Sequence, residues 1–192
     1  MLARTRRRGR GQIREARAHV NGAARFKQPM ACTEDERRAF ADRVRQGFAG
    51  AESLDGRIRD AKWLAFYHAA AETLGAVAAL KAPNARYRDA VFTQAEVPDS
   101  STDYPLELGW VFVVPAHRGN RIAEGLCRQL LARVPTAGVF ATTRTTNAPM
   151  IRALLALGFA RAGKPYPRRN EELILFLRPR PRPSVVASRP IP

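Results

Sequence analysis

Apolar positions along this chain recur with two spacings, which predict alternating helices and strands. Apolar residues three or four positions apart predict amphipathic helices over residues 33–46, 122–131 and 147–157. Short, nearly continuous apolar runs predict strands over residues 63–68, 73–80, 106–114, 139–143 and 173–177. Helices and strands alternate in one chain, and this order predicts a mixed α/β fold.

Residues that favour helix ends support these boundaries. Thr33-Glu-Asp-Glu36 is a capping box with acidic residues in the first helical turn. Asn147 is placed as the N-cap of the last helix, and Pro149 falls in its first turn, where a missing N–H costs nothing. Gly158 is placed for a left-handed C-cap.

Three segments have a weaker pattern. Residues 82–104 are polar and predict a long loop with one helical turn around residues 88–93. Residues 163–170 predict a turn. No clear strand precedes the first helix, so either one lies near residues 28–32 or the chain lacks it.

Length and composition limit the function classes. A chain of 192 residues with 45% apolar residues can build one domain with a core. No apolar run is long enough to cross a bilayer, and no secretory signal is visible. The two cysteines make neither a disulfide framework nor a metal site. We therefore expect no membrane association, no metal and a cytoplasmic location.

The net charge of +16 is concentrated near the two ends. Residues 1–27 carry nine basic residues and one acid, and residues 178–192 carry four arginines and no acid. We predict a basic, disordered extension over residues 1–29, one domain over residues 30–178 and a disordered Pro/Arg-rich tail over residues 179–192. Weak, sequence-independent contact with nucleic acid is the functional alternative for these ends.

The strand that ends near Val114 leads through a short basic turn into a helix, with the sequence Val-Val-Pro-Ala-His-Arg-Gly-Asn-Arg-Ile-Ala over residues 113–123. A helix start presents unpaired N–H groups and the positive end of the helix dipole, which favour phosphate. Arg118 and Arg121 add charged donors. An ordinary strand-to-helix connection on a basic surface would have the same pattern.

The turn resembles the acyl-CoA-binding motif of the GNAT superfamily of N-acetyltransferases, V-x-P-x-x-(R/Q)-x-x-(G/A)-x-(G/A). Val113, Pro115, Arg118 and Ala123 match it, whereas Arg121 stands where glycine is usual. A side chain there either hinders the approach of the backbone to a ligand or points outward and leaves its own N–H available. Farther along, Asn147 followed by Leu-Gly-Phe at residues 157–159 is similar to the family's second cofactor segment.

The resemblance covers roughly residues 60–178 and implies a mixed, mostly antiparallel central sheet flanked by helices. It also implies that acetyl-CoA enters where the two central strands splay apart. The family's cofactor contacts map onto backbone groups for the pantetheine arm, the basic turn for the pyrophosphate, and one asparagine. These residues are Phe112, Val113, Val114, Arg118, Gly119, Asn120, Arg121, Ile122, Ala123 and Asn147.

The implied reaction is direct attack of an amine on the thioester, which needs a base and a proton for the leaving thiolate. Glu107 is the candidate base, because some family members place a glutamate at this point. In a regular strand it would share a face with Gly109, Val111 and Val113. An ion pair with an arginine is the alternative role for Glu107.

The family's usual tyrosine acid is missing, since Leu154 occupies its position. Tyr166 is the first candidate to replace it, with Tyr104 or a water as alternatives.

The sequence thus favours an acetyl-CoA-dependent N-acetyltransferase acting on a primary amine of a small molecule or a protein. A basic nucleic-acid-associated protein with an inactive or secondary GNAT-like domain is the alternative, and another acyl donor is a third. No pattern identifies the acceptor. Final strands often mediate dimers in similar proteins, so a homodimer stays open.

Overall fold

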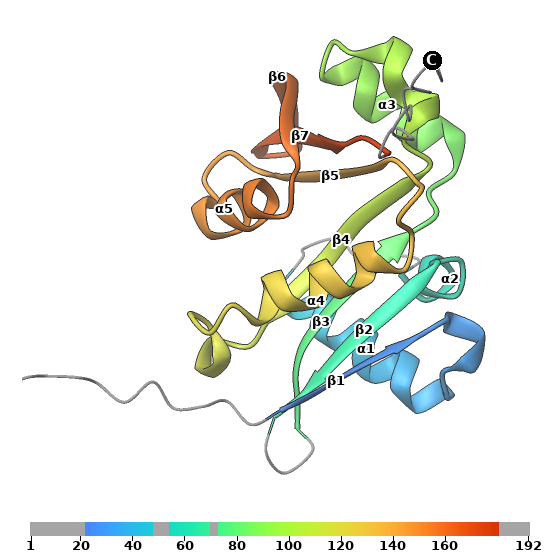
Figure 1. Ribbon diagram of the computed structural model, residues 1–192, viewed down its shortest axis with the longest axis vertical. Helices are drawn as coiled ribbons and strands as arrows, with labels where there is room; N and C mark the ends of the chain where they lie inside the picture. The colour runs from blue at the N-terminus through green and yellow to red at the C-terminus, as the bar shows by residue number, and fades with distance from the viewer. Residues whose placement is uncertain (1–21, 48–53, 70–72, 181–192) are drawn as a thin grey trace, which may run out of the picture.

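The computed structural model describes residues 22–47, 54–69 and 73–180 (Figure 1). The strands in these ranges are β1 (Ala23–Lys27), β2 (Trp63–His68), β3 (Leu74–Lys81), β4 (Leu106–Val113), β5 (Val139–Arg144), β6 (Ala160–Arg168) and β7 (Glu171–Arg178). The α-helices are α1 (Glu34–Gly47), α2 (Leu54–Arg59), α3 (Ala85–Gln94), α4 (Ile122–Ala132) and α5 (Ala148–Ala156). None of these helices has the length and apolar character needed to cross a membrane.

The described strands form one sheet in the order β1-β2-β3-β4-β5-β7-β6. All neighbours are antiparallel except β4 and β5, which are parallel. This confirms the mixed, mostly antiparallel sheet flanked by helices. Because β4 and β5 pair over only two residue pairs, the two strands run apart beyond Glu107 and Phe140 (Figure 1).

Helices cover both faces of the sheet. Successive residues of β2 and β3 belong alternately to two apolar clusters, as the period of a strand requires. One cluster contains the buried residues of α4 and α5. On the opposite face, α1 and α2 pack under β2, β3 and β4, whereas α3 packs on β5, β6 and β7. Two apolar clusters therefore lie side by side along this second face.

Four expectations need correction. Ala23–Lys27 forms β1, so the domain begins before residue 30. A 3₁₀ segment at Pro29–Ala31 occupies the place where a strand was considered. The loop expected over residues 82–104 is mostly helical, with α3 and a 3₁₀ segment at Pro98–Asp103. The turn expected over residues 163–170 is largely β6, which bulges between Ala162 and Tyr166.

These elements were not predicted because their residues, which are mostly exposed, do not alternate between apolar and polar types. The residues of β1 are mostly exposed, and in α3 only Val91 and Phe92 are buried. An edge strand or a helix lying on a surface needs few apolar residues, so periodicity is faint. The expected disordered ends lie mainly outside the described residues, from 1 to 21 and from 181 to 192.

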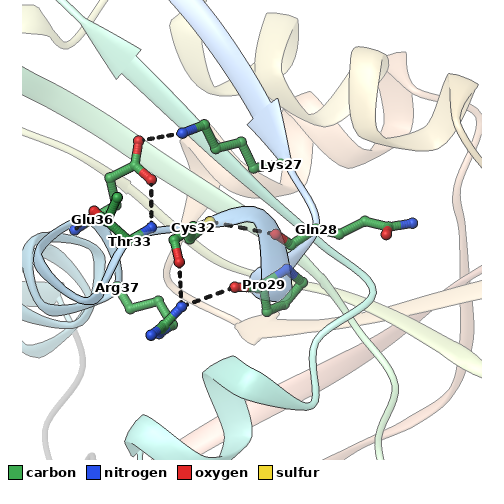
Figure 2. Close-up of polar contacts among 7 residues, drawn as sticks. All are labelled: Lys27, Gln28, Pro29, Cys32, Thr33, Glu36 and Arg37. Carbon is green, nitrogen blue, oxygen red and sulfur yellow. Dashed lines mark hydrogen bonds and ion pairs between the residues drawn. The ribbon is translucent and has the colours of Figure 1, made fainter.

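Side-chain contacts fasten β1 to α1 (Figure 2). Lys27 Nζ lies 2.5 Å from Glu36 Oε1. Glu36 also completes the predicted capping box, because its Oε2 accepts from the Thr33 N–H while the Thr33 hydroxyl accepts from the Glu36 N–H. Arg37 donates to the carbonyls of Pro29 and Cys32. The connection between the edge strand and the helix is thus held at several points.

Candidate active site

The turn between β4 and α4 has the geometry of an anion site. In the described chain the N–H groups of Gly119, Asn120 and Arg121 have no hydrogen-bond acceptor. Arg118 Nε donates to the Val113 carbonyl at 3.0 Å, which ties the turn to the end of β4. Free N–H groups next to a helix N-terminus favour a phosphate oxygen.

The structure shows whether the Arg121 side chain hinders access to the backbone of the turn or points outward. Its φ is +56°, in the left-handed region, which explains why a glycine suits this position. The side chain is 80% exposed and pairs with Glu124 at 3.2 Å. It therefore points outward and leaves its backbone N–H uncovered, which is the second of the two arrangements considered.

His117 packs the turn against the sheet. Its ring meets Tyr67 edge to face at 6.3 Å, and a Cβ on Gly75 would come within 2.6 Å of the imidazole. Close to it, the Val114 N–H donates to the Gly75 carbonyl at 2.9 Å. Because the Val114 N–H already donates to Gly75, it cannot also bond to a pantetheine arm. Only the Val114 carbonyl is left for the expected contact.

A bulge in β4 changes which residues share a face. Trp110 has a φ of +50°, and the register against β3 shifts at this point. Before the bulge, Glu107 and Gly109 lie on the face covered by α1 and α3, and Trp110 continues on that face. Val111 instead packs with the α4 cluster. The expectation that Glu107 shares a face with Val111 and Val113 is wrong, because the extra residue inverts the alternation.

Glu107 is a buried carboxylate in a polar cluster. Its side chain is only 4% exposed, and Lys81 Nζ lies 2.6 Å from Oε1. The Tyr87 hydroxyl donates to the same oxygen at 3.4 Å. Oε2 has no hydrogen-bond partner in the described chain. The ion pair anticipated for Glu107 exists, but its partner is a lysine and not an arginine.

Tyr166 belongs to the same cluster. It is 2% exposed, and its hydroxyl is buried without a partner among the described residues. Burial raises the pKa of Tyr166 above its usual value, and the nearby Tyr87 and Glu107 raise it further, against a lowering by Arg168. The structure thus brings together the two residues proposed as base and acid, each with an unsatisfied polar atom.

Three members of the cluster were not foreseen: Lys81, Tyr87 and Arg168. Arg168 Nη1 donates to the Tyr87 hydroxyl at 3.4 Å, and its guanidinium lies 5.4 Å from the centre of that ring. Burial, followed by the charge of Glu107, raises the pKa of Tyr87 to about 12. A charged Lys81 at the end of an apolar strand was the only sequence signal available for this group.

Comparisons with known proteins agree with this geometry. A sequence profile described as the acetyltransferase (GNAT) family matches residues 59–159, which is more than half of the chain. The chain belongs to the GNAT family. No curated protein sequence matches it significantly.

Solved structures share the GNAT fold. An acyl-CoA N-acyltransferase from Pseudomonas aeruginosa is 14% identical with a TM-score of 0.62, covering 82% of this chain and 99% of its own. Salmonella typhimurium YncA with its cofactor acetyl-CoA is 16% identical with a TM-score of 0.58, covering 88% and 99%. The Escherichia coli ribosomal-protein-S18-alanine N-acetyltransferase is 14% identical with a TM-score of 0.60, covering 85% and 98%. At identities of 14–16%, the likeness shows a shared fold and nothing more.

The second GNAT segment also has the predicted local structure. Asn147 caps α5, where its Oδ1 accepts from the Met150 N–H at 3.3 Å, so its amide NH₂ stays available. Leu154, which replaces the usual GNAT tyrosine, is fully buried in the core. Arg144 pairs with Glu171 at 2.7 Å. Tyr104, the other acid considered, stacks on Phe92 at 5.8 Å.

Acidic, histidine and cysteine side chains do not gather into a metal-binding group within the described ranges. Both cysteines there are buried and free.

Proposed function

We propose that this chain is an acetyl-CoA-dependent N-acetyltransferase that transfers the acetyl group directly to a primary amine of a small molecule or a protein. Membership of the GNAT family supports acetyl transfer in general. The observation that carries the more specific proposal is that Glu107 and Tyr166 lie in the same buried polar cluster. Both are buried in one cluster, and Glu107 Oε2 and the Tyr166 hydroxyl lack partners in the described chain.

The position of the cluster suits a reaction between two substrates. Glu107 pairs with Phe140 in the last register pair of β4 and β5, and beyond it β5 leaves the edge of β4 uncovered. An extended pantetheine arm can bond to this edge as a missing strand would. Its pyrophosphate would then reach the turn at residues 118–123, where the N–H groups of Gly119, Asn120 and Arg121 have no acceptor in the described chain.

The two groups have complementary roles in this mechanism. Glu107 Oε2 accepts a proton from the incoming ammonium, whose free pKa is near ~10.4, so that the nitrogen lone pair can attack the thioester carbonyl. The raised pKa of Tyr166 keeps its hydroxyl protonated at neutral pH. It can therefore donate a proton to the departing thiolate, in place of the tyrosine that Leu154 replaces.

Calorimetric titration of acetyl-CoA into the full chain tests the cofactor site. We expect binding by the parent and a loss of at least about tenfold in the variant Arg118→Glu, because a phosphate contact becomes a repulsion. Arg128→Glu is the matched control, since Arg128 is an exposed arginine on α4 outside the turn. Absence of binding by a folded parent would contradict the proposal.

A screen of primary amines then tests the chemistry. Glu107→Gln should lower kcat by about 10²- to 10⁴-fold, the usual range for losing a general base. Its affinity for acetyl-CoA should stay close to that of the parent, because Glu107 lies outside the turn. Equal kcat in parent and variant would rule out Glu107 as the base.

A further inference from the structure

One lysine of the chain is held against the proposed base. The sequence has only four lysines among 33 basic residues, and arginine provides nearly all other positive charge. Lys81 is one of the four, and its Nζ lies 2.6 Å from Glu107 Oε1 with its side chain 17% exposed. A lysine amine can lose its proton and be acylated, whereas a guanidinium stays protonated. The choice of lysine at this point therefore has a chemical consequence.

The surroundings hold this amine in place. Its Nζ lies 5.2 Å from the centre of the Trp110 ring, so the ammonium contacts an aromatic face as well as a carboxylate. Gly109 makes room for it, because a Cβ there would come within 2.9 Å of Cε and 3.0 Å of Nζ. Lys81 and Glu107 are register partners, and Glu107 pairs in turn with Phe140 where β4 and β5 begin to diverge. The amine thus lies at the start of the β4 edge along which the proposed function places the pantetheine arm.

We propose that Lys81 is a self-acetylation site, modified by the same acetyl-CoA and the same base that serve the external amine. The inference rests on the proposed function, because it needs a bound acyl donor and Glu107 as proton acceptor. The structural argument is that the chain places one of its own primary amines in contact with the carboxylate that an acceptor amine must reach.

The step balances without another reactant. Glu107 takes one proton from the Lys81 ammonium, and the freed lone pair forms a bond to the thioester carbonyl carbon. The carbon–sulfur bond breaks and the thiolate takes the proton of the Tyr166 hydroxyl. The nitrogen loses its second proton to solvent, from which Tyr166 is protonated again, and Glu107 later releases its proton, so that one proton is released overall. The products are Nε-acetyl-lysine and free coenzyme A. Acetylation removes the charge of Lys81 and so dissolves its ion pair with Glu107.

The test is to incubate the full chain with acetyl-CoA alone and follow acetylation of each lysine by peptide mass spectrometry. Lys62 is the internal control for uncatalysed acetylation, because it is exposed and has no carboxylate partner in the described chain. Exposure alone would make Lys62 react faster. We expect the reverse, with Lys81 acetylated at least about tenfold faster than Lys62.

Variants separate the possible results. Lys81→Arg keeps the charge and should lose the modification, while Glu107→Gln should slow acetylation at position 81 without changing Lys62. Acetylation of the lysines in the order of their exposure would overturn the inference. An unmodified Lys81 in a chain that acetylates an added amine would also overturn the inference. That result would leave the proposed function intact. A folded chain that binds no acetyl-CoA would overturn both.

Discussion

At the scale of single residues, Arg121 shows how a departure from a family pattern can be tolerated. The position requires a left-handed backbone, which costs a residue with a Cβ roughly 1–2 kcal/mol. The long side chain points away from the turn and pairs with Glu124, so the backbone N–H groups of the turn are not covered. What a glycine provides here is conformation, and an arginine can supply the same conformation at an energetic cost.

This account predicts different outcomes for two substitutions at residue 121. Arg121→Gly should keep acetyl-CoA binding and change the free energy of unfolding by less than about 1 kcal/mol, because relief of strain is offset by a more flexible unfolded chain. Arg121→Val should lower it by about 1–2 kcal/mol, since a β-branched residue resists a positive φ. Urea unfolding monitored by circular dichroism measures both.

Arg128→Val is the matched control for this pair. Arg128 also bonds to Glu124, at 2.7 Å, but from a helical position in α4. Both valine variants lose an ion pair with Glu124, whereas only Arg121→Val places a β-branched side chain at a positive φ. An equal loss of stability in Arg121→Val and Arg128→Val would show that the backbone conformation at residue 121 carries no cost.

At the scale of elements, the connection from β1 to α1 sets where the folded domain begins. β1 pairs with β2 along its whole length, from Ala23 opposite His68 to Lys27 opposite Leu64. The Phe26 ring lies under the Arg133 guanidinium at 4.0 Å, and Lys27 bonds to Glu36 (Figure 2). A strand with few apolar residues is thus joined to the rest of the molecule by its ladder and by cation contacts.

Deletion of β1 should therefore destabilise the protein. A chain that begins at residue 28 loses the ladder to β2, and at about 1 kcal/mol for each backbone hydrogen bond we expect a loss of roughly 3 kcal/mol or more. For a domain of this size that is a fall in Tm of about 6–12 °C. Differential scanning calorimetry measures it.

A chain that begins at residue 22 is the control for this deletion, because it keeps every described strand. It loses almost the same basic residues from the N-terminus. Equal Tm values for the two shortened chains would show that β1 contributes nothing to stability.

At the scale of the whole molecule, the free energy of unfolding should fall at alkaline pH because a buried thiol resists ionisation in the folded state. Burial raises the pKa of Cys127 from 9.0 to about 12. In the unfolded chain this thiol ionises above pH 9, whereas in the folded chain it stays protonated. The unfolded state therefore binds fewer protons between pH 9 and 12, and the folded protein loses stability as pH rises through that window.

We expect a fall of up to about 1.4 kcal/mol per pH unit from this single thiol within the window. Cys127→Ala should flatten the dependence, although the variant starts from a lower stability because it leaves a small void in the core. Urea unfolding at pH 8, 9, 10 and 11, which runs from below the window into it, provides the comparison. Parallel curves for parent and variant would contradict the assignment to Cys127.

Much of the fold could be predicted because its elements are locally encoded. The strand predicted over residues 63–68 coincides with β2, and the predicted caps Thr33 and Asn147 are confirmed by their hydrogen bonds. A capping residue bonds within its own turn, so the information lies within three or four positions. β1, α2 and β6 were not predicted, and only one turn of α3 was, since exposed or short elements leave no clear apolar period.

The site could be predicted only in part. Glu107 and Tyr166 were named from a family pattern and from the absence of the usual tyrosine, and the structure brings them into one cluster. Lys81, Tyr87 and Arg168 could not be found in this way. Arg168 and Tyr87 are 81 positions apart in the sequence, and no local pattern reports a contact of that separation.

The sequence by itself determined the order of helices and strands around the turn, the helix caps and the family, because these depend on residues that are close along the chain. Only the tertiary structure decided that Glu107 meets a lysine, that the bulge at Trp110 inverts the faces of β4, and that Arg121 points away from the turn. Burial, charge pairing and strand register each depend on segments that become neighbours only when the chain folds.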